Sequence, residues 1–138
     1  MADLAAIRKR LVDEAGRFDL VVDAENDDYT DQGANQVIND AIAWLNEIRS
    51  DLEVVLDTES FELLVADTDT NYWSDTKPHL LVNASRRALE ARHRNHTGRK
   101  EWDDTIIPEV HQIHANRIKE SIDADILEDP LTQGVMQG

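Results

Sequence analysis

The chain contains no cysteine, few aromatic residues and no long apolar run, and each of these features excludes a class of protein. Without cysteine among its 138 residues, it has neither a disulfide framework nor a cysteine-ligated zinc site. No segment approaches the roughly 20 apolar residues of a membrane span, and the charged first ten residues do not resemble a signal peptide. We therefore expect a soluble protein that is made in the cytoplasm, with one domain.

Basic residues are scarce as well. Fourteen basic residues against 29 acidic ones give a formal net charge of −15. This charge argues against direct binding to nucleic acid, because phosphate contacts require basic side chains, and against binding to anionic membranes. The acidic surface has two interpretations: it is solvated for solubility, or it forms a wall that repels DNA so that DNA slides past.

Apolar residues at helical spacing predict the first two helices. Residues 3–15 carry one such stripe, and Gly16 follows where a left-handed cap residue is expected. A second helix is predicted to begin near Asp31, whose carboxylate can cap free amides, and to end near Ser50.

Two further helices follow in the second half of the chain. Pro78 suits the first turn of a third helix, which Gly98 ends after Asn95. Pro108 interrupts the pattern of the last helix, so that helix either begins near Thr105 or kinks at the proline.

Short apolar runs predict the β structure. Residues 18–22 form a short extended piece, 23–31 an acidic loop, and 67–75 a polar loop. Two runs within Leu52–Val65, separated by residues 57–60, predict a β-hairpin. The expected fold is mainly α: a four-helix bundle-like subunit with a small β-hairpin between the second and third helices. Its domain covers residues 1–127, and an extended C-terminal tail covers 128–138.

Candidate metal sites are weak. Asp67, Asp69 and Asn71 alternate as in a calcium loop, but Tyr72 occupies the position of the required glycine and Pro78 that of the bidentate glutamate. Two histidine pairs and two acidic pairs have no third ligand or suitable helical frame, and there is no phosphate loop or nucleophile elbow. The histidine pairs are His93/His96 and His111/His114, and the acidic pairs are Glu59/Glu62 and Glu101/Asp104. We predict no enzyme, no cofactor and no metal.

Tyr72 and Trp73 place two large aromatic rings in an acidic stretch. They form either a hydrophobic lid on the helical core or a surface that contacts a partner. Both interpretations remain open from the sequence.

Two longer strings resemble small head–tail connector (adaptor) proteins of tailed phages. The first is Leu11-Val12-x-x-Ala15-Gly16-Arg17-Phe18-Asp19-Leu20-Val21, followed by Asp31-x-Gly33-Ala34-x-x-x-Ile38-Asn39-x-Ala41. The second is Asp69-Thr-Asn71-Tyr72-Trp73-x-x-x-x-Pro78-x-Leu80-Leu81, followed by Leu89-Glu90 and Arg94-Asn95-x-x-Gly98-x-x-x-Trp102. Together they cover about residues 4 to 110.

The resemblance implies a structural virion protein at the head–tail junction. Such subunits form a dodecameric ring beneath the portal protein, above tail, nozzle or stopper proteins, and DNA passes through the channel without specific binding. In such adaptors the C-terminal segment often reaches into the portal; here this would be residues 124–138, although a frayed end is an equal alternative. The expected partner-binding residues are Arg17, Tyr72, Trp73, Ile126, Leu127, Leu131, Val135 and Met136.

The basic residues cluster in two segments, 8–17 and 86–100. We expect them to face acidic loops of a neighbouring subunit or of the portal. Two other functions remain as alternatives: a free acidic regulatory protein that mimics DNA, and a metal-dependent phosphohydrolase. The first would occupy a basic site on a host protein, and the second would hydrolyse nucleotides with magnesium.

Overall fold

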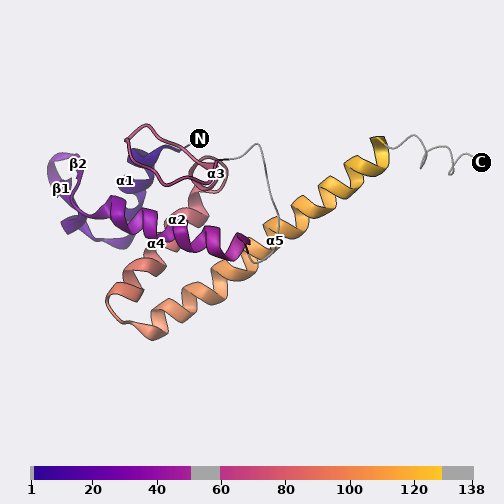
Figure 1. The fold of residues 1–138 in the computed structure, drawn as a ribbon. Helices are drawn as coiled ribbons and strands as arrows, with labels where there is room; N and C mark the ends of the chain where they lie inside the picture. Colours follow the sequence, from indigo (N-terminus) through magenta and orange to yellow (C-terminus); the bar gives the residue numbers. More distant parts are fainter. Residues whose placement is uncertain (1, 51–59, 129–138) are drawn as a thin grey trace, which may run out of the picture.

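The computed structural model describes residues 2–50 and 60–128 (Figure 1). Four long helices, one short helix, two short 3-10 helices (η1 and η2) and a two-stranded sheet make up the described part of the fold. None of the helices in the described part of the chain is both long and apolar enough to cross a membrane. In chain order the elements are α1 (Leu4–Ala15), η1 (Phe18–Leu20), β1 (Val21–Asp23), η2 (Ala24–Asn26), β2 (Asp28–Asp31), α2 (Ala34–Ser50), α3 (Tyr72–Thr76), α4 (Pro78–Arg92) and α5 (His96–Glu128).

The predicted class, mainly α with one small β-hairpin, is confirmed, but the observed hairpin lies between α1 and α2. There β1 pairs antiparallel with β2, with Val21 opposite Asp31. Of the two strands predicted within 52–65, the first lies outside the described residues, and the second is wrong, because 61–65 form no strand. The reason is a side chain: Asn39 of α2 donates to the Leu64 carbonyl and accepts from its N–H, at 2.8 and 2.9 Å.

The expected caps of the first two helices are confirmed. Gly16 ends α1 in the left-handed conformation, with φ at 67°. The Asp31 carboxylate accepts from the N–H groups of Gly33 and Asn35, at 3.0 and 2.9 Å, so it caps the start of α2 as predicted. Gly33 itself has φ at 121°, a conformation that requires glycine.

The boundary between α4 and α5 differs from the prediction. α4 begins at Pro78 as expected, but Gly98 lies in the first turn of α5. The Asn95 side chain accepts from the Gly98 N–H at 3.1 Å and caps this helix. A start near Thr105 is therefore wrong, and Pro108 lies inside a 33-residue helix.

One hydrophobic core lies among α1, α2, α4 and the first half of α5. α2 packs mainly on α4, and α4 on α5. The contribution of α5 ends early: Val110 is buried, Ile113 is partly buried against the core, and the helix then projects away from the body (Figure 1). The largest fully buried side chains include Leu4, Ile7, Leu11, Ile38, Ile42, Leu45, Trp73, Leu81 and Ile106.

Candidate partner-binding surfaces

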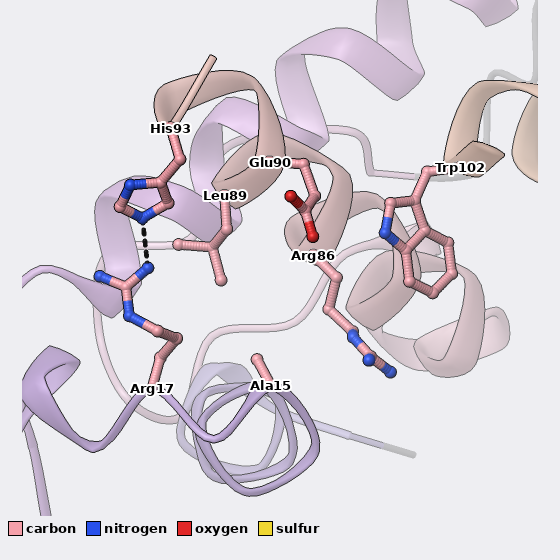
Figure 2. Close-up of a pocket in the computed structure, with 7 residues that line it drawn as sticks. All are labelled: Ala15, Arg17, Arg86, Leu89, Glu90, His93 and Trp102. Carbon is pink, nitrogen blue, oxygen red and sulfur yellow. Dashed lines mark hydrogen bonds between the residues drawn. The ribbon is translucent and has the colours of Figure 1, made fainter. Parts of the chain in front are cut away.

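A pocket of about 250 Å³ lies where the end of α1 meets α4 and α5 (Figure 2). Because three helices meet here, residues that are far apart in sequence line one hollow. Its chemistry is mixed, with cationic, acidic, aromatic and aliphatic side chains. The lining residues are Ala15, Arg17, Arg86, Leu89, Glu90, His93 and Trp102.

Arg17, a residue predicted to bind a partner, forms one wall of this pocket. Its Nε and Nη2 donate to both carboxylate oxygens of Asp19 at 2.9 Å. This pairing raises the pKa of Arg17 and lowers that of Asp19, mainly through the side-chain hydrogen bonds. Arg17 Nη1 also lies 2.5 Å from His93 Nε2 (Figure 2). Since a guanidinium only donates, His93 Nε2 must accept.

Arg86 faces Trp102 on the opposite side of the pocket. Its guanidinium carbon lies 5.0 Å from the centre of the indole ring, within range of a cation–π interaction. Within the described residues, Arg86 has no hydrogen-bond partner. Glu90 also lines the pocket, and its carboxylate accepts from Asn95 at 2.7 Å. The site therefore combines a cation on an aromatic ring with a nearby carboxylate, so it carries charges of both signs.

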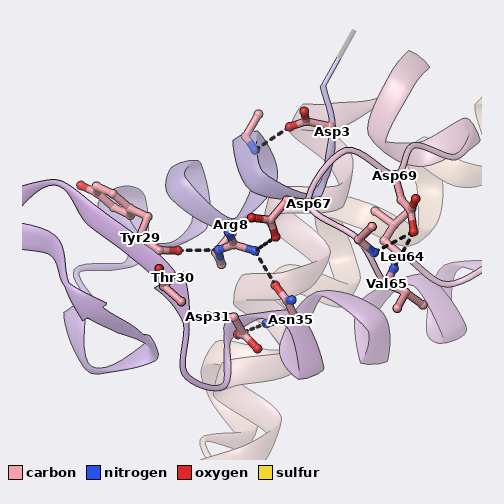
Figure 3. Close-up of polar contacts among 12 residues, drawn as sticks. Asp3, Arg8, Tyr29, Thr30, Asp31, Asn35, Leu64, Val65, Asp67 and Asp69 are labelled. Carbon is pink, nitrogen blue, oxygen red and sulfur yellow. Dashed lines mark hydrogen bonds and ion pairs between the residues drawn. The ribbon is translucent and has the colours of Figure 1, made fainter.

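Arg8 is structural and does not belong to a partner surface. It is only 3% exposed, and it joins four parts of the fold (Figure 3). Its Nε donates to the Tyr29 carbonyl at 2.6 Å, and its Nη1 donates to Asn35 Oδ1 at 3.0 Å and to Asp67 Oδ1 at 2.9 Å. The same contact lowers the pKa of Asp67. The expectation that Arg8 faces a neighbouring subunit is wrong, because its guanidinium is buried within its own chain.

Several other basic residues also pair inside the chain, which leaves fewer of them for a partner than the sequence suggested. The basic segment around residues 86–100 retains Arg86, Arg94 and Lys100 without ion pairs among the described residues. The intramolecular pairs are Lys9–Asp27 at 3.6 Å, Arg10–Glu14 at 3.8 Å, Arg87–Asp103 at 2.8 Å and Arg92–Asp40 at 2.6 Å.

The calcium-like string serves the fold. Asp67 binds Arg8, and Asp69 accepts from the N–H groups of Val65 and Ala66 at 3.0 and 2.8 Å (Figure 3). These N–H groups lower the pKa of Asp69. Asn71 caps α3 by accepting from the backbone of its third residue. Among the described side chains, no three metal-ligating residues come together.

Tyr72 and Trp73 lie in the core, with exposed fractions of 3% and 0%. The Trp73 indole donates to Asn46 Oδ1 at 2.8 Å, and the two rings pack edge to face with centres 5.2 Å apart. The expectation that this pair contacts a partner is therefore wrong for the free chain, and the lid interpretation is correct. Trp73 reaches α2 through Asn46, and the Tyr72 ring packs on the Phe61 ring with centres 5.3 Å apart.

An exposed apolar surface near the hairpin was not predicted. Phe18 is 55% and Val22 46% exposed. They line a second hollow of about 470 Å³, together with Asp23, Ala24 and Glu25. The sequence signal for this surface is the group of apolar residues at 18–22. The same pattern is typical of a buried strand, so it does not predict exposure.

The remaining predicted partner-binding residues lie at the end of the chain. Ile126 and Leu127 belong to α5, which ends at Glu128. These two residues are therefore helical and do not belong to an extended tail. Leu131, Val135 and Met136 lie outside the described residues. Comparisons of this chain with protein families, with curated proteins and with solved structures give no match.

Proposed function

We propose that this chain is a structural subunit of a tailed-phage particle: a head-to-tail adaptor that forms a ring beneath the portal and extends the DNA channel toward the tail. The observation that carries the proposal is the projecting end of α5. Past Ile113 the helix continues to Glu128 away from the core (Figure 1).

A helix in this position needs a partner. At 1.5 Å per residue, the stretch from Ile113 to Glu128 is about 22 Å long. An isolated helix of that length is marginal in water, because tertiary packing supplies most helical stability. A surface on another subunit or on the portal would supply the missing contacts.

The charge of the chain suits a channel wall. A formal charge of −15 per subunit would repel the phosphates of passing DNA, so DNA would move without binding. Copies of the same acidic chain also repel one another, which explains why a ring would need the portal as a template. The proposed partners are thus the portal, copies of this chain, and tail, nozzle or stopper proteins, with no catalytic role for any residue.

The test uses the full chain and the portal protein of the same phage. Mass photometry should find the chain monomeric alone and in a ring-sized complex with the portal. A variant truncated after Ile113 keeps the buried residues of the core and should lose the complex. Purified virions should contain the polypeptide by mass spectrometry.

Two results would reject the proposal: virions without the chain, or a portal that does not bind it under any salt condition. The DNA-mimic alternative makes the opposite prediction. In that case the chain would be a monomer or dimer that does not bind the portal and that competes with DNA for a basic protein.

A further inference from the structure

The exposed apolar surface near the hairpin is a compact patch. Large apolar side chains are exposed at four positions of the described chain, and two of them, Phe18 and Val22, line the same hollow. Single exposed apolar residues are ordinary, whereas neighbours that share a hollow mark a contact surface. We call this surface the hairpin patch: Phe18 of η1, Val22 and Asp23 of β1, and Ala24 and Glu25 of η2.

The backbone holds the hairpin patch in its exposed position. Leu20 and Val21 are buried and fill the core side of this segment. The Gln32 N–H donates to the Leu20 carbonyl at 2.8 Å, which fixes the segment to the far end of the hairpin. Because successive side chains of a strand point to opposite faces, burial of Val21 leaves Val22 outside. The patch is therefore formed before any partner arrives, which lowers the cost of binding.

The segment that carries the hairpin patch is acidic. Residues 19–31 hold six acidic side chains and no basic one. Asp19 and Asp27 form ion pairs within the chain, whereas Glu25 is exposed and has no hydrogen-bond or ion-pair partner among the described residues. A carboxylate in this state beside an apolar hollow suits a partner with basic groups around an apolar centre. The six residues are Asp19, Asp23, Glu25, Asp27, Asp28 and Asp31.

The same charge disfavours other occupants of the hollow. Six carboxylates repel the phosphates of nucleic acid and of anionic membranes. A second copy that docks through its own hairpin patch brings like charges together, because a two-fold contact pairs the same surface on both subunits. The basic segment 86–100 of a second copy lacks the apolar anchor, since none of the exposed large apolar residues in the described chain lies there. A segment of a different protein matches the patch best.

We infer that the hairpin patch binds a segment of another protein in which one large apolar side chain is flanked by lysine or arginine. The apolar side chain enters the hollow beside Phe18 and Val22. The flanking cations pair with Asp23 and Glu25. This inference goes beyond the adaptor proposal, because it uses no part of α5. Figure 1 places the hairpin and the far end of α5 at opposite ends of the molecule, so each can contact a separate partner.

A displayed library of random peptides, selected on the full chain, tests the inference without knowledge of the partner. Enriched peptides should carry a leucine, phenylalanine or tryptophan between lysine or arginine residues. A synthetic peptide of the most enriched sequence, measured by fluorescence anisotropy, should bind Phe18→Ser about tenfold more weakly than the parent chain. The matched control is Leu63→Ser, because Leu63 is 52% exposed, against 55% for Phe18, and lies outside the hollow. This control should bind like the parent.

A charge variant provides a second measurement if Phe18→Ser fails to fold. Glu25→Lys changes an exposed side chain, so the core stays intact. It should bind the same peptide about tenfold more weakly and with less dependence on salt. Glu109→Lys, the same charge change at an exposed position of α5, should alter neither property.

Three results would overturn the inference. The first is a selection without enrichment, or with enriched peptides that lack basic flanks. The second is equal binding of the peptide to the parent and to the folded patch variants. The third is a parent chain that sediments as a dimer and becomes monomeric in Phe18→Ser, because the patch would then belong to a contact between copies.

Discussion

Replacing Arg8 by alanine should remove the most connected polar side chain of the core. Arg8 is 3% exposed and donates three hydrogen bonds, which join α1 to β2, to α2 and to the segment that carries Asp67. A hydrogen bond from a charged donor contributes about 1.5–3 kcal/mol. The full sum does not apply, because the Asp67 side chain is 63% exposed and water can replace its lost partner.

We therefore expect Arg8→Ala to lower the free energy of unfolding by about 3 kcal/mol, a large share of the roughly 5–15 kcal/mol of an ordinary domain. For a chain of this length the melting temperature should fall by about 10 °C. Urea unfolding followed by tryptophan fluorescence, to which the buried Trp73 contributes, measures the change. Arg8→Lys should be intermediate, because one ammonium cannot reproduce the planar geometry of the guanidinium.

Arg10 is the matched control on the same helix. Its side chain is 40% exposed, and its one ion pair among the described residues, with Glu14, is 3.8 Å long. Arg10→Ala should cost less than about 1 kcal/mol. If Arg8→Ala proved no more costly than Arg10→Ala, Arg8 would not be the buried junction described here, and the interpretation of Figure 3 would be refuted.

Three further predictions follow from the fold. Gly33→Ala should cost about 1–3 kcal/mol in urea unfolding, because φ at 121° is strained for any residue with a Cβ atom; a neutral result would contradict this backbone conformation. The pKa values of Asp19, Asp67 and Asp69 are lowered in the folded chain. Their stabilisation is therefore complete above the ordinary carboxyl pKa of about 4 and is lost as the pH falls through the lowered values. Circular dichroism during acid titration should show unfolding only below about pH 4; an onset near pH 6 would disagree. Trp73→Ala should cost about 3–5 kcal/mol, while the fraction that still folds should bind the portal normally; a selective loss of binding would revive the contact interpretation.

The helices that the sequence predicted are those with local signals. The stripe of α1 and the left-handed Gly16, the Asp31 cap before α2, and Pro78 at the start of α4 act within one or two turns. Such signals depend on neighbours along the chain, so the sequence alone was sufficient. The start of α5 has a local signal too, since Asn95 caps it, but a glycine such as Gly98 after a helical stripe also predicts a helix end.

The errors arose where distant residues decide the conformation. The strands of the real hairpin have only three and four residues and few apolar positions, and Arg8 from α1 holds the Tyr29 carbonyl. The apolar run at 61–65 resembles a strand. In the structure the Asn39 side chain hydrogen-bonds both the carbonyl and the N–H of Leu64. No local pattern reveals either contact.

Composition and periodicity alone determined an acidic, mainly helical chain without a cysteine or phosphate-loop motif. The tertiary structure decided which charged and aromatic residues are available: it buries Arg8 and Trp73, keeps Arg94 and Lys100 on the surface, and extends α5 past its core. The physical reason is that helix formation depends on residues within one turn, whereas exposure depends on which helices pack together.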